Sequence, residues 1–226
     1  MPRRFWSPIE KDKTMKLYGV HLSPFVMRPL LVARAKGHDL ALDMPEGGIK
    51  SADFVAMSPM AKMPLLHDGD FHLPESQVIA EYLDAALSGP KMIDADPKTA
   101  ARQRLLCRLV DIYIVPELGG LFNARDRPEA LAPALEKLAL AMGYIEHFRS
   151  AGDTFAIGDS FSIADAALVP IFFFFDAFAG LGAAALIADQ TGLAAYWARA
   201  KASDLGSRAI AEQAAGLKAM MAQRAG

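Results

Sequence analysis

The spacing of apolar side chains in the first 90 residues shifts between the period of a strand and that of a helix. Residues 15–20 (MKLYGV) predict a short strand, and residues 38–44 alternate polar and apolar side chains as a second strand would. Between them, Ser23 and Pro24 begin a helix that ends before Gly37. Serine favours the N-cap, proline the first helical position and glycine the C-terminal end. These segments predict a strand-helix-strand unit.

A hairpin and one more helix follow this unit. Asp68 and Gly69 stand between the apolar runs 64–67 and 70–73, and an Asp-Gly pair in that position is typical of a tight hairpin turn. Residues 77–87 then return to helical spacing. The resulting order of elements predicts a small α/β domain. The apolar stripe expected on its last helix consists of Val78, Ile79, Tyr82 and Leu83.

Helical spacing dominates the rest of the chain. Residues 88–100 are polar and rich in turn formers, and they predict a linker. The helix after this linker is expected to end or kink at Pro116. Ser162 and Asp165 resemble a capping box with Asp in place of the usual Glu, and residues 193–202 and the tail beyond them are expected to be helical. Two apolar faces are formed by Leu105, Leu109, Ile112 and Pro116 and by Leu135, Leu138, Met142 and Ile145, while Arg104, Arg108 and Asp111 share another face.

The longest apolar run, residues 164–186, approaches the length of a membrane-spanning helix. It contains two aspartates, a proline and two glycines, which favours a buried helix followed by a glycine-rich turn. At the N-terminus, no apolar stretch follows Arg3 and Arg4, so residues 1–14 are not expected to be a signal peptide. They are expected to be either a loose extension or the result of a start codon assigned too early. The sequence therefore predicts no association with a membrane.

Composition and charge narrow the function further. The chain has 226 residues and a formal net charge of −2, so no strong positive field is available to hold nucleic acid or anionic lipid non-specifically. Its single cysteine, Cys107, excludes a disulfide framework and multi-cysteine metal sites, and a lone thiol suits a reducing, cytoplasmic compartment. The five histidines show no metal-binding spacing such as HExxH, so no metal is expected.

Two segments near the N-terminus carry a resemblance to a known family. Residues 23–28 (SPFVMR), followed by residues 35–37 (AKG), look like the first strand–helix turn of the soluble glutathione transferase family. Residues 58–64 (SPMAKMP) look like the segment ahead of its cis-proline. The SPF and AKG triplets are most similar to the tau-like and omega-like branches and to some bacterial members. Because Ser23 stands where omega-like members carry a cysteine, the resemblance favours serine-type chemistry over thiol-transferase chemistry.

Two later segments extend the resemblance over roughly residues 15–205. Residues 75–83 (ESQVIAEYL) look like the family's Glu-Ser pair and third helix, and residues 158–165 (GDSFSIAD) look like the capping box of its helical domain. The resemblance implies an α/β plus all-α fold class. A thioredoxin-like, glutathione-binding N-terminal domain over residues 15–90 would be followed by an all-helical C-terminal domain over residues 97–226, with the extension ahead of both.

The resemblance also implies that Ser23 is catalytic. Its hydroxyl would lie at a helix N-terminus and donate a hydrogen bond to the thiolate of glutathione, which the helix dipole favours as well. A hydrogen bond to a charged group contributes about 1.5–3 kcal/mol, enough to lower the pKa of a thiol by roughly one to two units. Taken alone, the Ser23-Pro24 pair indicates no more than an N-cap. Tyr18 is a rival hydroxyl, because other branches use a tyrosine near the end of the first strand.

The other functional groups of glutathione would be bound by the other matched segments. Met63, turned by a cis bond to Pro64, would pair with the cysteinyl residue like an added strand. Ser76 at a helix start would bind the γ-glutamyl carboxylate, and Glu75 the ammonium group. The candidates for the glycyl carboxylate are Lys62 and Lys50. From the residues alone, simpler interpretations are available for each of them. Pro64 would be an ordinary trans proline, Glu75 and Ser76 would be capping residues only, and the two lysines would be solvated surface side chains.

The implied second substrate is hydrophobic and electrophilic, and the implied assembly is a homodimer. The pocket for this substrate would lie between the two domains, and its candidate residues are His21, Leu22, Tyr113, Pro116 and Phe122. The predicted function is conjugation of the glutathione thiolate to that electrophile. Neither nucleic acid nor a membrane is an expected partner.

Two other functions are consistent with the sequence. The same site supports other glutathione chemistry, such as reductive dehalogenation, ether cleavage, isomerisation or peroxide reduction. The other function is that of a non-enzymatic binding protein, because a fold does not fix a function. Pro29 interrupts the helix that would hold Ser23, and Ala61 and Met63 stand where many relatives have a glycine and a β-branched residue.

Overall fold

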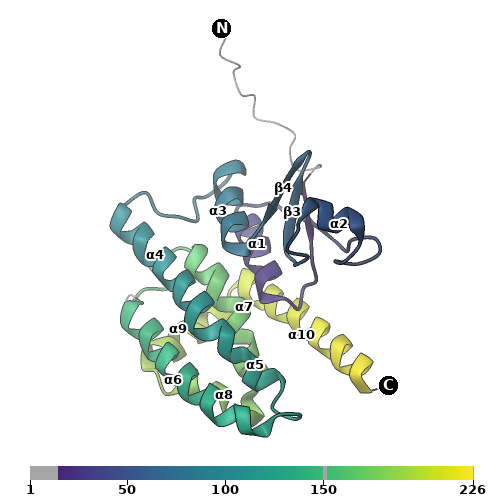
Figure 1. The fold of residues 1–226 in the computed structure, drawn as a ribbon. Helices are drawn as coiled ribbons and strands as arrows, with labels where there is room; N and C mark the ends of the chain where they lie inside the picture. Colours follow the sequence, from purple (N-terminus) through teal and green to yellow (C-terminus); the bar gives the residue numbers. More distant parts are fainter. Residues whose placement is uncertain (1–14, 150–151, 226) are drawn as a thin grey trace.

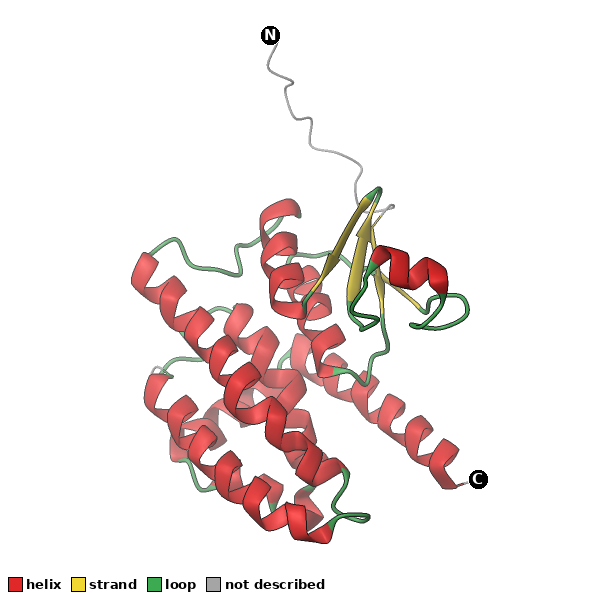
Figure 2. Cartoon of the chain, in the orientation of Figure 1, coloured by secondary structure: helices red, strands yellow, loops and turns green. Residues whose placement is uncertain are grey.

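The computed structural model describes residues 15–149 and 152–225, and the expected extension over residues 1–14 lies outside the described residues. A small sheet with its helices occupies one end of the molecule, and a helical bundle occupies the other (Figure 1). Figure 2 shows that strands are confined to the first of these parts. The structure confirms the fold class of an α/β unit followed by an all-helical unit.

The sheet has four strands in the order β2-β1-β3-β4. β1 pairs parallel with β2, and the β1–β3 and β3–β4 pairs are antiparallel. Leu17 lies opposite Leu66 and points into the main hydrophobic core, whereas Tyr18 and Leu65 pack with Phe54 in a smaller cluster. This arrangement confirms the thioredoxin-like domain. The strands are β1 Met15–Tyr18, β2 Ala41–Asp43, β3 Leu65–Asp68 and β4 Phe71–Pro74; the helices are α1 Pro24–Ala35, α2 Ala52–Met57 and α3 Ser76–Ala86.

The second part is built around α7, in which every residue from Ile163 to Phe175 is buried. In the described part of the chain, no helix is long and apolar enough to cross a membrane. The predicted capping box is present, because Asp165 accepts a hydrogen bond from the Ser162 N–H at 2.9 Å. The elements in order are α4 Pro97–Leu109, η2 Val110–Ile114, η3 Val115–Glu117, α5 Leu118–Phe122, η4 Pro128–Ala130, α6 Leu131–Phe148, α7 Ile163–Ala177, η5 Ala179–Leu181, α8 Ala183–Ala188, α9 Thr191–Ala202 and α10 Asp204–Ala225.

Three local predictions were wrong in detail. The short helix α2 was missed, although Ser51 caps it by accepting a hydrogen bond from the Phe54 N–H at 3.3 Å; six residues are too few to show a periodic pattern. The predicted linker extends too far, because α4 begins at Pro97 behind the N-cap Asp96. Val78 does not belong to the apolar stripe of α3, since half of it is exposed.

The helix after the linker departs from a uniform helical period at Val110–Ile114 (η2), which forms a π-helical turn. A π-helical turn bonds residue i to i+5, so it rotates the following side chains relative to an α-helix. Ile112, expected on the buried face with Leu105 and Leu109, is 47% exposed for this reason. The helix after the linker was predicted to end or kink at Pro116. The structure agrees, because Pro116 lies in the first turn of η3, after α4 and η2 have ended.

Candidate active site

A cavity of about 590 Å³ lies between the sheet unit and the first helices of the bundle. The start of α1, the segment before β3 and the start of α3 form one wall, and α4, η2 and η3 form the other. Six of the residues expected to bind or activate glutathione lie together in it. The lining consists of Ser23, Phe25, Ile49, Met60, Ala61, Lys62, Met63, Pro64, Glu75, Ser76, Gln77, Arg108, Asp111 and Val115.

Ser23 is the N-cap of α1 and is half-buried at the cavity wall. Its Oγ accepts a hydrogen bond from the Val26 N–H at 3.4 Å, and its own N–H donates to the Val20 carbonyl at 3.0 Å. A hydroxyl has one donor and two acceptor lone pairs, so capping consumes an acceptor and leaves the O–H free to donate. Capping and donation to a sulfur are therefore compatible. The helix continues through Pro29 to Ala35 without a break.

Tyr18, the rival hydroxyl, belongs to a different environment. Its ring packs edge-on against Phe54 at 5.6 Å between centroids, and the Lys16 ammonium lies 4.7 Å from its centroid. Tyr18 is 8% exposed and sits in the cluster beneath α2. Among the described residues that line the cavity, Tyr18 does not occur. This placement favours Ser23 as the hydroxyl nearest to a bound thiol.

The segment before β3 lines the cavity and has uncommon backbone conformations. The Met63-Pro64 bond is cis, as the resemblance implies, and Met63 lies two residues before the first ladder residue, Leu65. In the described chain, Ala61 (φ 48°) and Glu75 (φ 71°) are the two non-glycine residues with positive φ, and both line the cavity. Such conformations persist only where the surrounding structure imposes them, and they cluster at functional sites.

The start of α3 lies at the cavity wall. Ser76 is its first residue and is 6% exposed, while Glu75 at the N-cap makes no side-chain capping bond. The first N–H groups of a helix lack intrahelical partners and carry a partial positive charge. Because the cap supplies no side-chain acceptor and Ser76 lines the cavity, this helix start is suited to an anion.

The opposite wall contains residues that the sequence did not single out as functional. Arg108 and Asp111 line the cavity, together with Val115. The Asp111 carboxylate forms a bidentate pair with Arg28 of α1, at 2.6 Å to Nη2 and 3.2 Å to Nη1. Their common helix face with Arg104 was the available signal, but the helical period alone did not show which of these side chains reaches the cavity. Phe25 and Gln77, also missed, are neighbours of predicted residues.

Several expected residues lie elsewhere. Lys50 follows the lining residue Ile49 but is not itself part of the described lining. Tyr113 packs its ring against Tyr144 at 5.5 Å and is 46% exposed, and Pro116 is exposed on η3. Phe122 lines a second cavity of about 820 Å³, which is formed with the end of α7 and the far half of α10.

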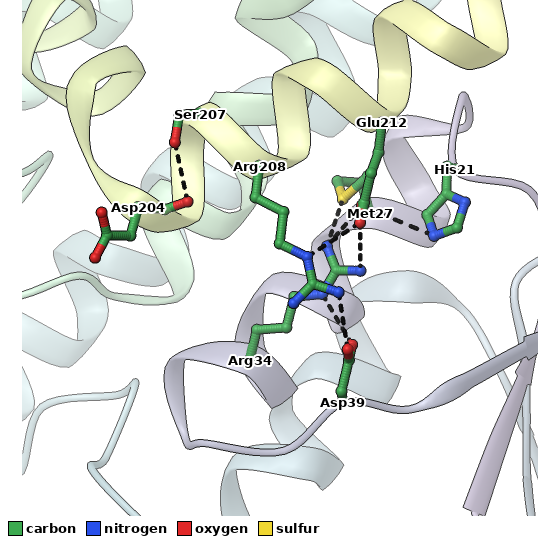
Figure 3. A network of polar contacts seen from close by, with 8 residues as sticks. All are labelled: His21, Met27, Arg34, Asp39, Asp204, Ser207, Arg208 and Glu212. Atoms are coloured by element: carbon green, nitrogen blue, oxygen red, sulfur yellow. Dashed lines mark hydrogen bonds and ion pairs between the residues drawn. The ribbon is translucent and has the colours of Figure 1, made fainter.

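His21 and Leu22 contact α10 instead of the cavity. Figure 3 shows His21 beside Glu212, which is also paired with Arg34, while Arg208 reaches Asp39. The distances are 3.8 Å from His21 Nε2 to Glu212, 2.7 Å from Arg34 Nη1 to Glu212 and 2.8 Å from Arg208 Nη2 to Asp39. Burial would raise the pKa of Glu212, but the two guanidinium groups hold it below its usual value. This network fixes the base of α10 against the loop that carries Ser23.

The chain is similar to glutathione S-transferases along most of its length. Residues 17–91 match the family described as "Glutathione S-transferase, N-terminal domain", and residues 109–204 match "Glutathione S-transferase, C-terminal domain". Glutathione S-transferase 3 of Zea mays is 32% identical over 179 residues, covering 69% of this chain and 77% of that protein. A glutathione S-transferase of Hyoscyamus muticus is 30% identical, covering 67% and 77%.

A solved structure gives the same result in three dimensions. The apo form of glutathione S-transferase III superimposes with a TM-score of 0.71 at 26% identity, covering 88% of this chain and 96% of the other. The chain therefore belongs to the glutathione S-transferase family.

Proposed function

We propose that this family member is a glutathione transferase that joins the glutathione thiolate to an electrophilic carbon of a hydrophobic compound. The observation that carries the proposal is the shared cavity. It combines a serine at a helix start, the Met63-Pro64 segment that leads into strand β3 and a second helix start, and each provides a group that one part of glutathione requires.

Ser23 is the catalytic residue in this proposal. Its hydroxyl donates to the sulfur, and the N-terminus of the 12-residue helix α1 adds a partial positive charge. A free thiol has a pKa of about 8.5, so few molecules are ionised at neutral pH. A stabilisation of about 1.5–3 kcal/mol raises the thiolate population by roughly ten- to a hundred-fold. Catalysis then consists of holding the thiolate ready and oriented toward the electrophile.

The rest of glutathione would be held by the wall that contains Ser23. We assign the γ-glutamyl carboxylate to Ser76, the cysteinyl backbone to Met63 beside Pro64, and the glycyl carboxylate to Lys62. We assign the γ-glutamyl ammonium group to Glu75, which lines the same cavity. Lys50 is the second cation we assign to the glycyl end, since it adjoins the cavity residue Ile49.

The electrophile would approach the sulfur over apolar side chains. Phe25 and Val115 provide such a surface inside the first cavity. We also assign Phe122 to this role, because the second cavity that it lines is bounded by Leu217, near the contact of Leu22 with α10. His21 and Leu22 would then form the rim between Ser23 and that cavity. Tyr113 and Pro116 are retained as outer residues of the same approach, although the described lining of neither cavity includes them.

Three further properties belong to the proposal. The chain would act as a homodimer in the cytoplasm and would need no metal. Within the described residues, no group of three or more metal-ligating side chains occurs. We place the domain boundaries at residues 15–90 and 97–226. Light scattering of the purified protein tests the dimer, and limited proteolysis between residues 90 and 97 tests the boundary.

The thiol pKa of bound glutathione tests the central mechanism. Thiolate absorbance is followed during a pH titration of the complex in the wild type, Ser23→Ala and Tyr18→Phe. We expect ionisation well below the free value in the wild type and in Tyr18→Phe, and a return toward the free value in Ser23→Ala. A wild-type complex that titrates like free glutathione would overturn thiolate activation and favour a binding role. Loss of the shift in Tyr18→Phe alone would assign the activation to Tyr18.

A further inference from the structure

Two histidines face each other across the hairpin that β3 and β4 form. His67 and His72 are directly opposite in the antiparallel ladder, and His67 Nδ1 lies 3.0 Å from His72 Nε2. Both side chains are half-buried, and their ring centroids are 5.0 Å apart. An N–H···N hydrogen bond requires that one of the two nitrogens carries no proton. The contact is therefore compatible with two neutral rings or with one imidazolium, but not with two.

The surroundings of His67 oppose a second positive charge. Lys16 of β1 lies opposite His67 on its other side, so Lys16, His67 and His72 form one row across three strands. Burial lowers the pKa of His67 from its ordinary value of 6.5, and the charges of His72 and Lys16 lower it further, whereas Asp68 acts in the opposite direction. The folded hairpin therefore favours the neutral form of the His67 ring.

The acidic groups around this row offer little compensation. Asp68 points to the other face of the sheet, where it accepts a hydrogen bond from the Tyr82 hydroxyl at 2.7 Å. Asp43 of β2 pairs with the ammonium group of the row at 3.3 Å. Asp53 of α2 and Asp70 of the hairpin turn are exposed and do not act on the pKa of the first histidine. A doubly protonated pair would thus remain largely unneutralised.

The hairpin joins two segments of the cavity wall. β3 begins at Leu65, directly after Pro64, and β4 ends at Pro74, directly before Glu75 and Ser76. Pro64, Glu75 and Ser76 all line the cavity. β4 is an edge strand that pairs with β3, and Pro74 has no N–H to contribute to that ladder. The β3–β4 pairing therefore determines how these two wall segments lie relative to each other.

Protonation of both rings would break the contact between them. Two imidazolium rings cannot share a hydrogen bond, and their charges repel each other and the Lys16 ammonium. We propose that the His67–His72 contact is an acid-sensitive switch, which loosens the β3–β4 pairing at mildly acidic pH and so lowers the affinity of the cavity for glutathione. This inference rests on the proposed function, because it concerns glutathione in the same cavity.

Closure of the hairpin depends on pH through proton linkage. A histidine whose pKa is lower in the closed hairpin than in the open one binds fewer protons when the hairpin is closed. Closure is fully favoured above the ordinary histidine pKa of about 6.5, and this contribution is lost as the pH falls toward the lower pKa of the closed pair. Because glutathione would contact both wall segments, its affinity should decrease over the same window.

Binding of S-methylglutathione tests the switch, because its sulfur carries no proton and thiolate activation does not contribute. Its carboxylates stay ionised and its amine stays protonated between pH 7 and pH 5. Dissociation constants are measured by titration calorimetry over this range for the wild type, the double variant His67→Gln/His72→Gln and His147→Gln. Glutamine keeps a donor and an acceptor across the strands but does not titrate. His147 is the matched control, because it is an exposed histidine on α6.

We expect the Kd of the wild type to rise about five- to ten-fold between pH 7 and pH 5, since one unit of pKa difference corresponds to a tenfold change in an equilibrium. The double variant should change less than about two-fold on the same basis, and His147→Gln should behave like the wild type. In an NMR titration of the wild type, the rings of His67 and His72 should titrate in two separate steps, the second well below the ordinary histidine pKa.

The outcomes separate this inference from the proposed function. If the double variant loses affinity in acid by the same factor as the wild type, the pair does not control binding and the inference is wrong. If the double variant does not fold, the NMR titration of the wild type decides, and two rings that titrate independently near the ordinary value would overturn the switch. If the wild type binds neither glutathione nor S-methylglutathione at pH 7, the proposed function itself fails.

Discussion

Gly216 of α10 lies directly against Leu22, the residue before the proposed catalytic serine. A Cβ built on Gly216 would come within 2.9 Å of the Leu22 Cβ and 3.2 Å of its backbone nitrogen. Three residues earlier, Gln213 is fully buried, and its Nε2 donates to the Pro170 carbonyl at 3.0 Å and to the Leu22 carbonyl at 3.5 Å. The C-terminal helix therefore buttresses the loop that holds Ser23.

Gly216→Ala should impair activity although alanine is the better helix former. In an unobstructed helix this exchange is worth up to about 1 kcal/mol of added stability. Here the new methyl group must displace either α10 or the Leu22 backbone, so we expect no gain in stability and a several-fold lower kcat. Gly143→Ala in α6 is the control, because nothing lies within 4 Å of its added Cβ. Equal stabilisation of both variants against urea, with full activity, would contradict the role of α10 in supporting the loop that holds Ser23.

The charge network at the base of α10 predicts a loss of stability in acid. Although burial opposes it, pairing with Arg34 and Arg208 lowers the pKa of Glu212 from its ordinary value of 4.5. An acid whose pKa is lower in the folded state stabilises the protein above its unfolded pKa, and this contribution disappears as the pH falls through the folded pKa. The free energy of unfolding should therefore decrease below about pH 4.5.

Glu212→Gln should flatten that pH dependence. At neutral pH the variant should also lose about 2 kcal/mol, because the Arg34 side chain is 6% exposed and loses its main charged partner. Urea unfolding at pH 7 and between pH 3 and pH 5 measures both effects. Glu129→Gln, an exposed glutamate on η4, serves as the control and should leave the profile unchanged. An unaltered acid limb in Glu212→Gln would show that other carboxylates cause it.

At position 61 we expect glycine to be tolerated and a β-branched residue to be destabilising. Its φ of 48° lies in the left-handed region, which costs a non-glycine residue about 1–2 kcal/mol. Ala61→Gly relieves that cost but adds freedom to the unfolded chain, so its stability should stay within about 1 kcal/mol of the wild type. Ala61→Val should lose more than this and raise KM for glutathione, as steady-state kinetics would show. Equal KM values for glutathione in both variants would show that the backbone conformation at Ala61 does not contribute to glutathione binding.

The glutathione wall of the site was predictable because its residues mark the ends of elements. Ser23 and Ser76 begin helices, and Pro64 precedes a strand, so local rules place them at one edge of a small sheet. Arg108 and Asp111 were not predictable as a pair in the cavity. Arg108 precedes the π-helical turn that contains Asp111, and the 3.6-residue period encodes neither that turn nor the pairing of Asp111 with the distant Arg28. The apolar pocket residues depend on helix packing across the domains in the same way.

Asp165 should be the most sensitive polar residue of the helical domain. It is fully buried, and its two oxygens accept hydrogen bonds from the Ala156 N–H and the Ser162 N–H, both at 2.9 Å. Asp165→Ala leaves both buried N–H groups without an acceptor, so we expect the free energy of unfolding to fall by about 3 kcal/mol or more. Asp96→Ala removes an equivalent cap at the exposed start of α4 and should cost only about 1 kcal/mol. Urea unfolding of both variants measures the difference. Losses of equal size would mean that burial adds nothing to the capping bond, and the α7 start would then not be a centre of stability for this domain.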